Sequence, residues 1–280
     1  MEWQNKICTG RKMFVILQPH MKTPIVTLTT DWGNQGFFAG MVKGALYSAV
    51  EGVQVVDITH QVDPFSVMSA TFVVKHACLG FPAGTVHIID VATQPPLLAV
   101  KARGQYFLCC DNGVPATAFD DEIEDAAIIP VPEGVPLGFI AHTHFVPVAQ
   151  RLLTGTPLSD IGPRPEGFMR RNLTGWLQMG DEYRVYIHYI DTYGNAYLGM
   201  TYSEFEELRA GRAFEMIVRE QRISEVMDSY YQQHATADPR RKLRLTVSAT
   251  GLLELAVKES SFAQLIGLRT NDAVILKFKD

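Results

Sequence analysis

The stretch TLTTDWGNQGFFAGMVKGAL, residues 27–46, joins two patterns that decide the fold. Its first residues are mostly β-branched and predict the end of a strand, while its last residues place apolar side chains at helical spacing. Asp31 and three glycines lie between them. Small-molecule sites in open α/β sheets are often built in this order, because ligands bind beyond the carboxyl ends of the strands. We therefore expect Asp31 to bind a ligand, for example a ribose diol, with a turn or helix N-cap aspartate as the alternative.

Strands and helices alternate through the first half of the chain. Strand-like runs cover residues 24–30, 53–60, 84–92 and 97–113, and helix-like runs cover 37–52, 66–81 and 145–155. Strands that are almost continuously apolar and alternate with helices are typical of a parallel sheet covered on both faces. The sequence thus predicts an α/β nucleoside-binding domain over residues 23–160 with a mostly parallel sheet.

The second half has a different pattern. A segment rich in Pro, Gly and Ser, TPLSDIGPRPEG at 156–167, is typical of a linker, and short strands separated by turns follow it. We expect an all-β barrel domain over residues 161–280, interrupted by one helix at 223–234. Residues 1–22 are expected to be an N-terminal extension, with MFVIL at 13–17 as an extra strand.

Composition narrows the possible functions. The 280 residues include 25 Lys and Arg and 30 Asp and Glu, which gives a net charge of −5, and 47% of residues are hydrophobic. The sequence contains no run of Lys and Arg residues of the kind that binds nucleic acid, so we do not expect a nucleic-acid partner. The apolar runs are too short to cross a membrane. The first twenty residues lack a clear signal-cleavage site, so a cytoplasmic location is expected. The four cysteines have no CxxC spacing, which favours buried, reduced thiols.

Polar side chains follow several predicted strands. Asp57 and His60 end one strand in VVDITHQVDPF, and Phe65 follows Pro64 there, so its ring could stack on a base. Asp57 and His60 can equally be held in a turn by their own side-chain hydrogen bonds. Asp90 ends a third strand, where a carboxylate is costly unless it is paired or faces a cleft.

Three further motifs contain candidate residues. CCDNG at 109–113 is a strong turn signal that can be a plain hairpin. His142 and His144 form an H-x-H pair, which on a strand could bind a metal beside Asp90 or Asp111, although no third histidine at useful spacing supports a metal site. YIDTYGN at 189–195 is an aromatic and polar turn of the second domain, in which the asparagine either stabilises the turn or contacts a small ligand with its amide.

Seven segments, taken in order, resemble the S-adenosylmethionine (SAM) hydroxide adenosyltransferase family, which includes the SAM-dependent fluorinase and chlorinase. They are TLTTDWG, VVDITHQVDPF, FPAGTVHIID, YFLCCDNG, FVPVAQRL, IDTYGN and TGLLELAV with LIGL. The resemblance implies an α/β domain, a β-barrel and a homotrimer that binds SAM between subunits. It implies attack of water on the ribose C5′, which releases methionine and adenosine, with SAM as substrate and no cofactor.

The resemblance also assigns roles to residues. Asp31 matches the ribose-binding aspartate, and Phe65 matches an aromatic residue beside the nucleoside. Asp191, Tyr193 and Asn195 match the motif that contacts adenine and methionine from the neighbouring subunit.

The catalytic set of the family is incomplete in this chain. The hydrolases position water with an Asp-Arg-His set, of which Asp90 matches the aspartate. VATQPPLL at 91–98 has no arginine, and Thr93 falls near a halogenase threonine. Ile140 occupies the place of the histidine, so His142 can substitute only if the backbone shifts.

The methionine site is altered as well. Gly36 replaces the acid that holds the methionine ammonium, and Ala249-Thr250 replaces a Ser-Arg pair. Three hypotheses follow: an enzyme that cleaves SAM or a related nucleoside with a rearranged water site, a non-catalytic relative that binds a nucleoside or only assembles, and metal-assisted hydrolysis through His142, His144 and Asp90.

Overall fold

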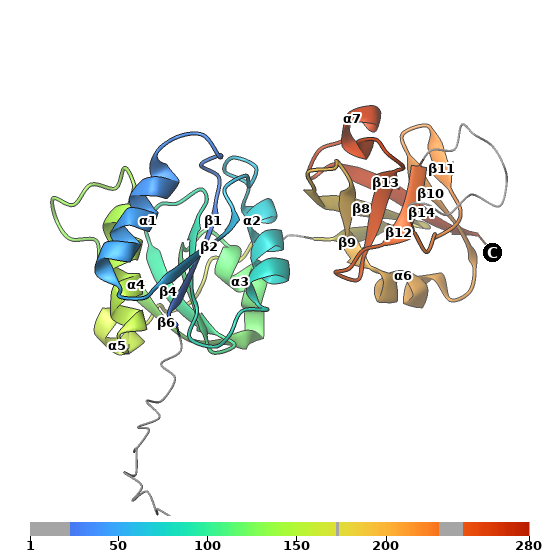
Figure 1. Cartoon of the computed structure of the whole chain (residues 1–280). Coiled ribbons are helices and arrows are strands. Elements are labelled where there is room, and N and C mark those ends of the chain that lie inside the picture. Colours follow the sequence, from blue (N-terminus) through green and yellow to red (C-terminus); the bar gives the residue numbers. More distant parts are fainter. Residues whose placement is uncertain (1–22, 172–173, 230–242, 280) are drawn as a thin grey trace, which may run out of the picture.

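The protein consists of two domains, an α/β domain and a barrel-like domain (Figure 1). The computed structural model describes residues 23–171, 174–229 and 243–279. The extension at 1–22, with the strand expected at 13–17, lies outside these residues.

The α/β domain contains six strands and the helices that cover them. Its elements are β1 (Ile25–Thr30), α1 (Phe38–Ala49), β2 (Gln54–Thr59), α2 (Val67–Val73), the π-helical turn η1 (Val74–Cys78), β3 (Val86–Asp90), β4 (Leu97–Ala102), β5 (Gln105–Cys110), α3 (Val114–Phe119), the 3-10 turn η2 (Asp120–Glu122), β6 (Ile123–Ile129), the π-helical turn η3 (Ala141–Phe145), α4 (Val146–Leu153) and α5 (Leu158–Ile161).

The sheet has the strand order β2-β1-β3-β5-β4-β6. Strands β2, β1, β3 and β5 pair in parallel, whereas β4 pairs antiparallel with both of its neighbours. One apolar core packs α1, α4 and α5 on one face, and a second packs α2 and α3 on the other. The prediction of a mostly parallel sheet with helices on both faces is confirmed.

Two adjacent cysteines show how the sheet divides these cores. Cys109 belongs to the core under α2 and α3, and Cys110 belongs to the core under α1 and α4. Successive strand residues point to opposite faces, as the sequence predicts. Cys78, Cys109 and Cys110 are free and buried, and burial raises the pKa of each thiol.

The second domain is an antiparallel sheet that nearly closes on itself. Its elements are β7 (Trp176–Met179), β8 (Glu182–Ile190), β9 (Ala196–Thr201), α6 (Tyr202–Arg209), β10 (Ala213–Val218), β11 (Gln221–Ile223), β12 (Leu243–Val247), β13 (Leu252–Val257), α7 (Phe262–Ile266) and β14 (Ala273–Lys279). The strand order is β11-β10-β14-β8-β9-β13-β12, with β7 on β8. A bridge between Met227 and Thr246 brings the two ends together. The predicted all-β barrel domain is therefore confirmed.

The helix expected at 223–234 does not form over its described part. Ile223 ends β11, and Met227 makes a bridge to β12. Residues 230–234 lie outside the described part of the chain. Within the described part of this domain, helices α6 and α7 begin at the side-chain caps Thr201 and Ser261.

Aromatic stacking joins the two domains within the chain. The ring of Phe72, on α2, lies parallel to that of Tyr189, on β8, with centroids 4.6 Å apart. The Thr270 hydroxyl also donates to Asp63 Oδ2 at 3.2 Å. The first contact places α2 against the barrel, and the second does the same for the loop between β2 and α2.

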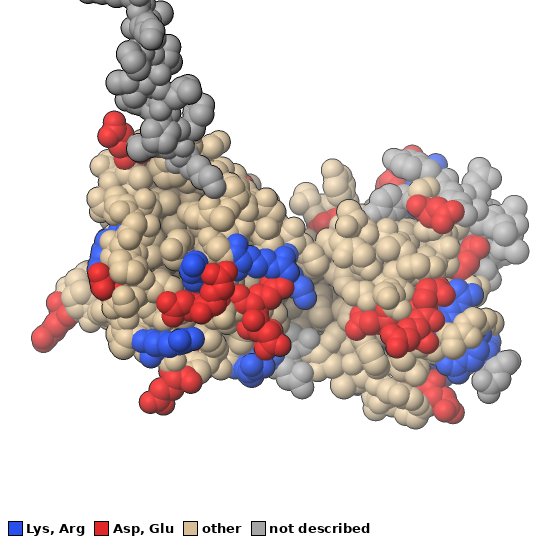
Figure 2. All heavy atoms as spheres, turned by 90° about the horizontal axis from the view of Figure 1, so that it is seen from below, with Lys and Arg blue, Asp and Glu red and all other residues tan. Residues whose placement is uncertain are grey.

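The surface carries no extended patch of one charge on the face shown in Figure 2, where acidic and basic side chains alternate. No helix among the described residues is long and apolar enough to span a membrane.

Candidate active site

Asp31 lies directly beyond the carboxyl end of β1 and orders the loop that follows β2. Its Oδ2 accepts a hydrogen bond from the backbone N–H of Phe65 at 2.9 Å. Phe65 has a φ of 61°, in the left-handed region, and its side chain is 79% exposed. Asp31 thus has a turn-stabilising role, but Oδ1 remains available to a ligand hydroxyl.

Asp90 ends the neighbouring strand and lies beside Asp31. Thr30 and Asp90 are register partners in the parallel pair β1 and β3. Asp90 is buried, and its Oδ2 accepts a hydrogen bond from the Trp32 indole N–H at 3.0 Å. Burial raises the pKa of Asp90, and the Asp31 carboxylate raises it further, against the opposing effects of Thr93 and Trp32. Two carboxylates therefore lie at the carboxyl ends of two neighbouring parallel strands.

Thr93 is the third residue of this edge. It lies in the loop that follows β3, and the interaction of its hydroxyl with the Asp90 carboxyl group lowers the pKa of Asp90. The same hydroxyl is buried without a well-aligned hydrogen-bond partner among the described residues. A buried hydroxyl in this condition can donate to or accept from a ligand or a water molecule.

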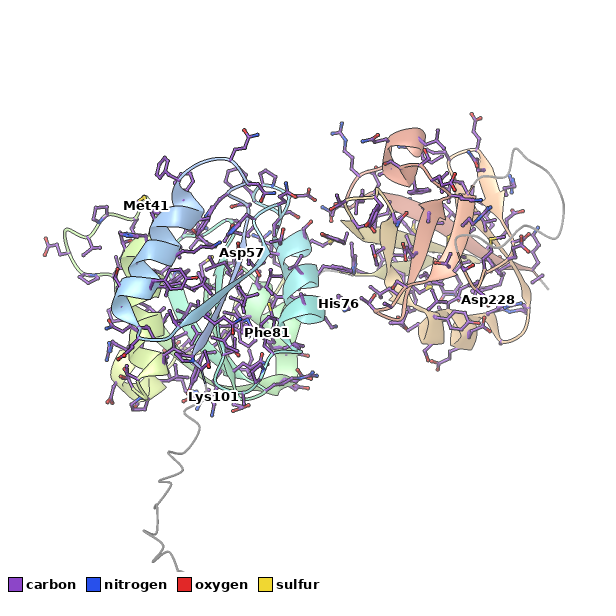
Figure 3. The ribbon with its side chains drawn as sticks, in the orientation of Figure 1. Met41, Asp57, His76, Phe81, Lys101 and Asp228 are labelled. Carbon is purple, nitrogen blue, oxygen red and sulfur yellow. The ribbon has the colours of Figure 1, made fainter. Side chains whose placement is uncertain are left out.

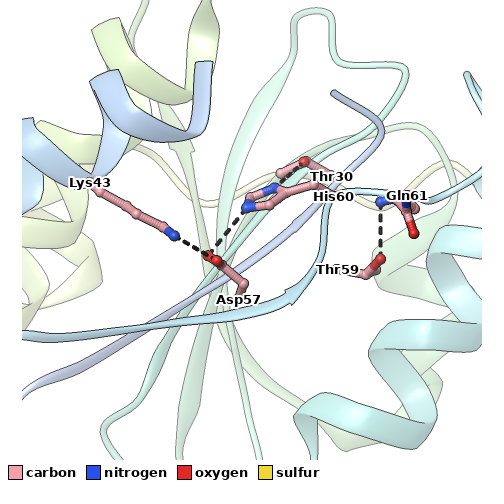
Figure 4. A network of polar contacts seen from close by, with 6 residues as sticks. All are labelled: Thr30, Lys43, Asp57, Thr59, His60 and Gln61. Atoms are coloured by element: carbon pink, nitrogen blue, oxygen red, sulfur yellow. Dashed lines mark hydrogen bonds and ion pairs between the residues drawn. The ribbon is translucent and has the colours of Figure 1, made fainter. Parts of the chain in front are cut away.

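Asp57 and His60 form a network with Thr30 and Lys43 (Figure 4). The Thr30 hydroxyl lies 2.8 Å from His60 Nδ1, and Asp57 Oδ1 lies 3.2 Å from His60 Nε2. Lys43 Nζ pairs with Asp57 Oδ2 at 2.5 Å. This network supports the alternative in which Asp57 and His60 hold a turn.

Trp32 connects that network to Asp90. Its ring stacks on the His60 ring with centroids 5.5 Å apart, while its N–H binds Asp90. A cavity of about 290 Å³ opens beside Trp32, Gly36 and Asp57. Trp32 and Lys43 were not predicted as site residues, although Trp32 directly follows Asp31 in the sequence.

His142 does not reach Asp90. Residues 141–145 form a π-helical turn, not a strand, and the His142 ring stacks on Phe139 with centroids 5.8 Å apart. His144 is buried on a different side of the turn, where Thr143 Oγ1 lies 2.7 Å from its Nδ1. No cluster of three metal-ligating side chains occurs among residues 23–171, 174–229 and 243–279.

CCDNG proves to be a docking point for the interdomain linker. Asp111 Oδ1 accepts the backbone N–H of Met169 at 2.8 Å, and the Arg171 guanidinium donates to the Asn112 carbonyl at 2.7 Å. The segment leads from β5 into α3, so the hairpin alternative is wrong.

The turn at 190–195 forms a second candidate region on the barrel. Asp191 accepts the Asn195 backbone N–H at 2.9 Å and its side-chain amide N–H at 3.1 Å. The Asn195 backbone carbonyl accepts the Asp191 N–H at 3.0 Å, so among the described residues it is the side-chain oxygen Oδ1 that can serve a ligand. Tyr193 is 79% exposed. Gly194 has a φ of +82°, and a Cβ there would lie 2.0 Å from Ser261 Oγ. A cavity of about 540 Å³ beside Tyr193 is lined by barrel residues alone.

Comparison with known families agrees with this arrangement. The SAM hydroxide adenosyltransferase N-terminal domain matches residues 26–162, and the C-terminal domain of the same family matches residues 185–275. The chain belongs to the SAM hydroxide adenosyltransferase family.

Named relatives of this family are similar over different lengths of the chain. An (R)-S-adenosyl-L-methionine hydrolase of Salinispora arenicola is 28% identical over 262 residues, which covers 89% of this chain and 96% of the relative. The corresponding hydrolase of Salinispora tropica is 27% identical over the same length. A fluorinase of an Actinoplanes species is 24% identical over 178 residues, covering 51% of this chain and 59% of the relative.

Solved structures share the fold of this family member. An uncharacterized conserved protein from Thermotoga maritima superposes with a TM-score of 0.77 at 24% identity, covering 90% of this chain and 99% of that protein. A conserved hypothetical protein from Thermus thermophilus gives a TM-score of 0.69 at the same identity, covering 91% and 100%.

Proposed function

We propose that this protein binds SAM or a related adenosine-containing ligand between the α/β domain of one subunit and the barrel of its neighbour in a homotrimer. The observation that carries the proposal is the exposure of two aromatic side chains, Phe65 and Tyr193, each held beside a carboxylate or amide group by hydrogen bonds within its own loop. Large exposed aromatic groups of this kind are typical of surfaces that a ligand or a partner covers.

Asp31 is suited to the ribose. Phe65 N–H occupies one carboxylate oxygen, and the other can accept hydrogen bonds from the two ribose hydroxyls. Phe65 would lie against the nucleoside, and Asn195 and Tyr193 of the neighbouring subunit would contact the adenine. Asp191 acts indirectly, because its oxygens hold the Asn195 backbone and amide.

The reaction proposed for this site is substitution at C5′. A water oxygen forms a bond to C5′ while the C5′–S bond breaks, and its electron pair leaves with sulfur as the neutral thioether of methionine. The water loses one proton, so the products are adenosine, methionine and H⁺. Because the leaving group is already a sulfonium, catalysis consists of holding water in line and excluding bulk solvent. Asp90, which is buried beside Thr93, would hold that water.

We expect the rate to be very low or zero. His142 stacks on Phe139 and has no contact with Asp90, so the rearranged dyad is not formed. Gly36 supplies no carboxylate for the methionine ammonium. These observations support two candidate functions equally. One is a slow SAM hydrolase, and the other is a relative that binds a nucleoside without cleaving it.

Incubation with SAM tests the proposal directly. Chromatography should detect adenosine and methionine in equal amounts if the protein is a hydrolase. Calorimetric titration with adenosine tests binding independently of turnover. Absence of both adenosine binding and SAM cleavage would refute the proposed site.

A further inference from the structure

A third cavity lies between the two domains of the same chain, and neither Asp31 nor Asp90 lines it. It has a volume of about 420 Å³, within the size range of small-molecule sites. One face of α2 and η1 forms its first wall, with Met68, Phe72, Lys75 and His76 at helical spacing. Figure 3 shows His76 on the side of α2 that faces the barrel.

The barrel forms the opposite wall. His188 on β8, Thr201 at the end of β9, Glu204 on α6 and Leu252 on β13 line it. Gly199 makes room for the His188 ring, since a Cβ at that position would lie 2.3 Å from Nε2. The cavity therefore depends on both domains, which is a common location for a ligand site.

Two opposite charges face this cavity from different domains. Lys75 has no hydrogen bond or ion pair among the described residues, and no ion pair joins it to Glu204. Glu204 Oε2 accepts the backbone N–H and the hydroxyl of Thr201, both at 2.7 Å. Among the described residues, the one hydrogen bond to its Oε1 is a long one of 3.5 Å from the Trp176 indole N–H. Lys75 can accept an anion as partner, and Glu204 Oε1 can accept a cation.

The two histidines add polar groups without charge. Burial lowers the pKa of both His76 and His188, and the nearby Lys75 ammonium lowers each further. His188 bonds to the Thr174 backbone, and its other nitrogen, Nε2, is buried without a partner among the described residues. Because Gly199 covers this nitrogen, a ligand could contact it only after a rotation of the His188 ring. Of these two acceptors, Glu204 Oε1 is therefore the one that a cationic group can reach without such a rotation.

We propose that this interdomain cavity binds a free apolar α-amino acid, with its carboxylate on Lys75, its ammonium on Glu204 and its side chain against Met68, Phe72 and Leu252. A zwitterion satisfies both charges at once, whereas a simple anion leaves the free oxygen of Glu204 without a partner. The inference concerns a site separate from the one at Asp31 and does not depend on it.

Calorimetric titration of the full chain with L-leucine tests the ligand class. N-acetyl-L-leucine lacks the ammonium, and isopentylamine lacks the carboxylate. We expect L-leucine to bind once per chain and each truncated compound to bind at least about tenfold more weakly, because each loses a charged hydrogen bond. No binding of L-leucine at millimolar concentration, or equal binding of all three compounds, would overturn the proposal.

Two variants test the location. Lys75→Met and Glu204→Gln should each weaken L-leucine binding about tenfold or more. Glutamine can replace glutamate in the capping box with Thr201, so the second variant should keep α6 folded. Lys101→Met and Glu207→Gln, matched changes outside the cavity, should bind as the wild type does. Unchanged affinity in both cavity variants would overturn the assignment.

Two further measurements separate this site from its alternatives. Asp31→Ala should retain L-leucine binding, and loss of binding in that variant would place the amino acid at the nucleoside site instead. Inorganic phosphate that binds to the wild type and to Glu204→Gln, but not to Lys75→Met, would replace the amino-acid site with a simple anion site.

Discussion

Asp31 and Phe65 lie 34 residues apart in the chain, and a 2.9 Å hydrogen bond from the Phe65 backbone N–H to Asp31 Oδ2 joins them. One carboxylate therefore orders the loop that presents the aromatic ring and still offers an oxygen to a ligand. The proposed ribose contact and the loop conformation depend on the same side chain.

Asp31→Ala should weaken adenosine binding by about 1.5–3 kcal/mol, because charged hydrogen bonds to the ribose are lost. For the same reason, the wild type should bind 2′,3′-dideoxyadenosine much more weakly than adenosine. Calorimetric titration measures both effects.

Asp31→Asn is the matched control for the loop. Its amide oxygen can still accept the Phe65 N–H, so the loop is retained while the charge is lost. If the wild type bound adenosine and 2′,3′-dideoxyadenosine equally well, Asp31 would stabilise the loop and make no contact with the ribose.

A site shared between subunits predicts complementation. Asp31→Ala and Asn195→Ala change opposite halves of the proposed site, so neither homotrimer should bind adenosine well. Mixed trimers formed by co-expression should regain roughly a quarter of the sites, since one interface in four pairs two intact halves in a closed ring. Light scattering should show a trimer, and a stable monomer at micromolar concentration would rule out the shared site.

His87 should make the stability of the α/β domain dependent on pH. It is fully buried between Thr27 Oγ1 at 2.6 Å and Gln105 Oε1 at 3.1 Å. Burial lowers its pKa from 6.5 to about 4, against the opposing effect of Gln105. Between these values the unfolded chain binds more protons than the folded chain, so the stabilisation present above pH 6.5 is lost as the pH falls towards 4.

The expected loss is about 3 kcal/mol of unfolding free energy between pH 7.5 and 4. Urea titrations should show this fall in the wild type and a correspondingly smaller fall in His87→Gln, which cannot titrate. Parallel pH profiles for the two proteins would show that His87 is already protonated in the fold or is hydrated there.

The sequence alone predicts that Asp31 and Asp90 each lie at the carboxyl end of a strand. Both follow β-branched, apolar runs, and parallel strands bring their carboxyl ends to one edge. The hydrogen bonds from Trp32 to Asp90 and from Phe65 to Asp31 were not predictable, because each depends on how distant loops pack. The hydrophobic periodicity of a sequence predicts which residues are buried. It does not predict which side chains of different loops contact one another.

Residues 141–145 show a second limit of the sequence. Two histidines separated by one residue fit a strand, but the apolar residues around them pack as a helix continuous with α4. In this turn the His142 ring stacks on Phe139, and in the described part of the chain no hydrogen bond or ion pair joins His142 to Asp90. An error of this kind follows from helix and strand ambiguity in short apolar runs.

SAM hydrolysis by the wild type should be very slow or absent, and two losses with different effects are responsible. Without an acid at Gly36 the methionine ammonium is unpaired, so binding of SAM suffers. Without an arginine, and with His142 stacked on Phe139, the water beside Asp90 is not oriented, so the chemical step suffers. Chromatographic assay of the wild type, Asp90→Ala and His142→Ala separates the possibilities.

Equal inactivity of all three proteins, with adenosine binding retained, is the expected result and identifies a nucleoside-binding relative or an enzyme for another nucleoside. Steady release of adenosine by the wild type that both substitutions abolish would contradict it. That outcome would require the 141–145 turn to move in the ligand-bound protein until His142 and Asp90 hold one water molecule between them. His144→Ala is the matched control, because His144 is buried beside Thr143 and its loss should leave any such activity in place if the protein remains folded.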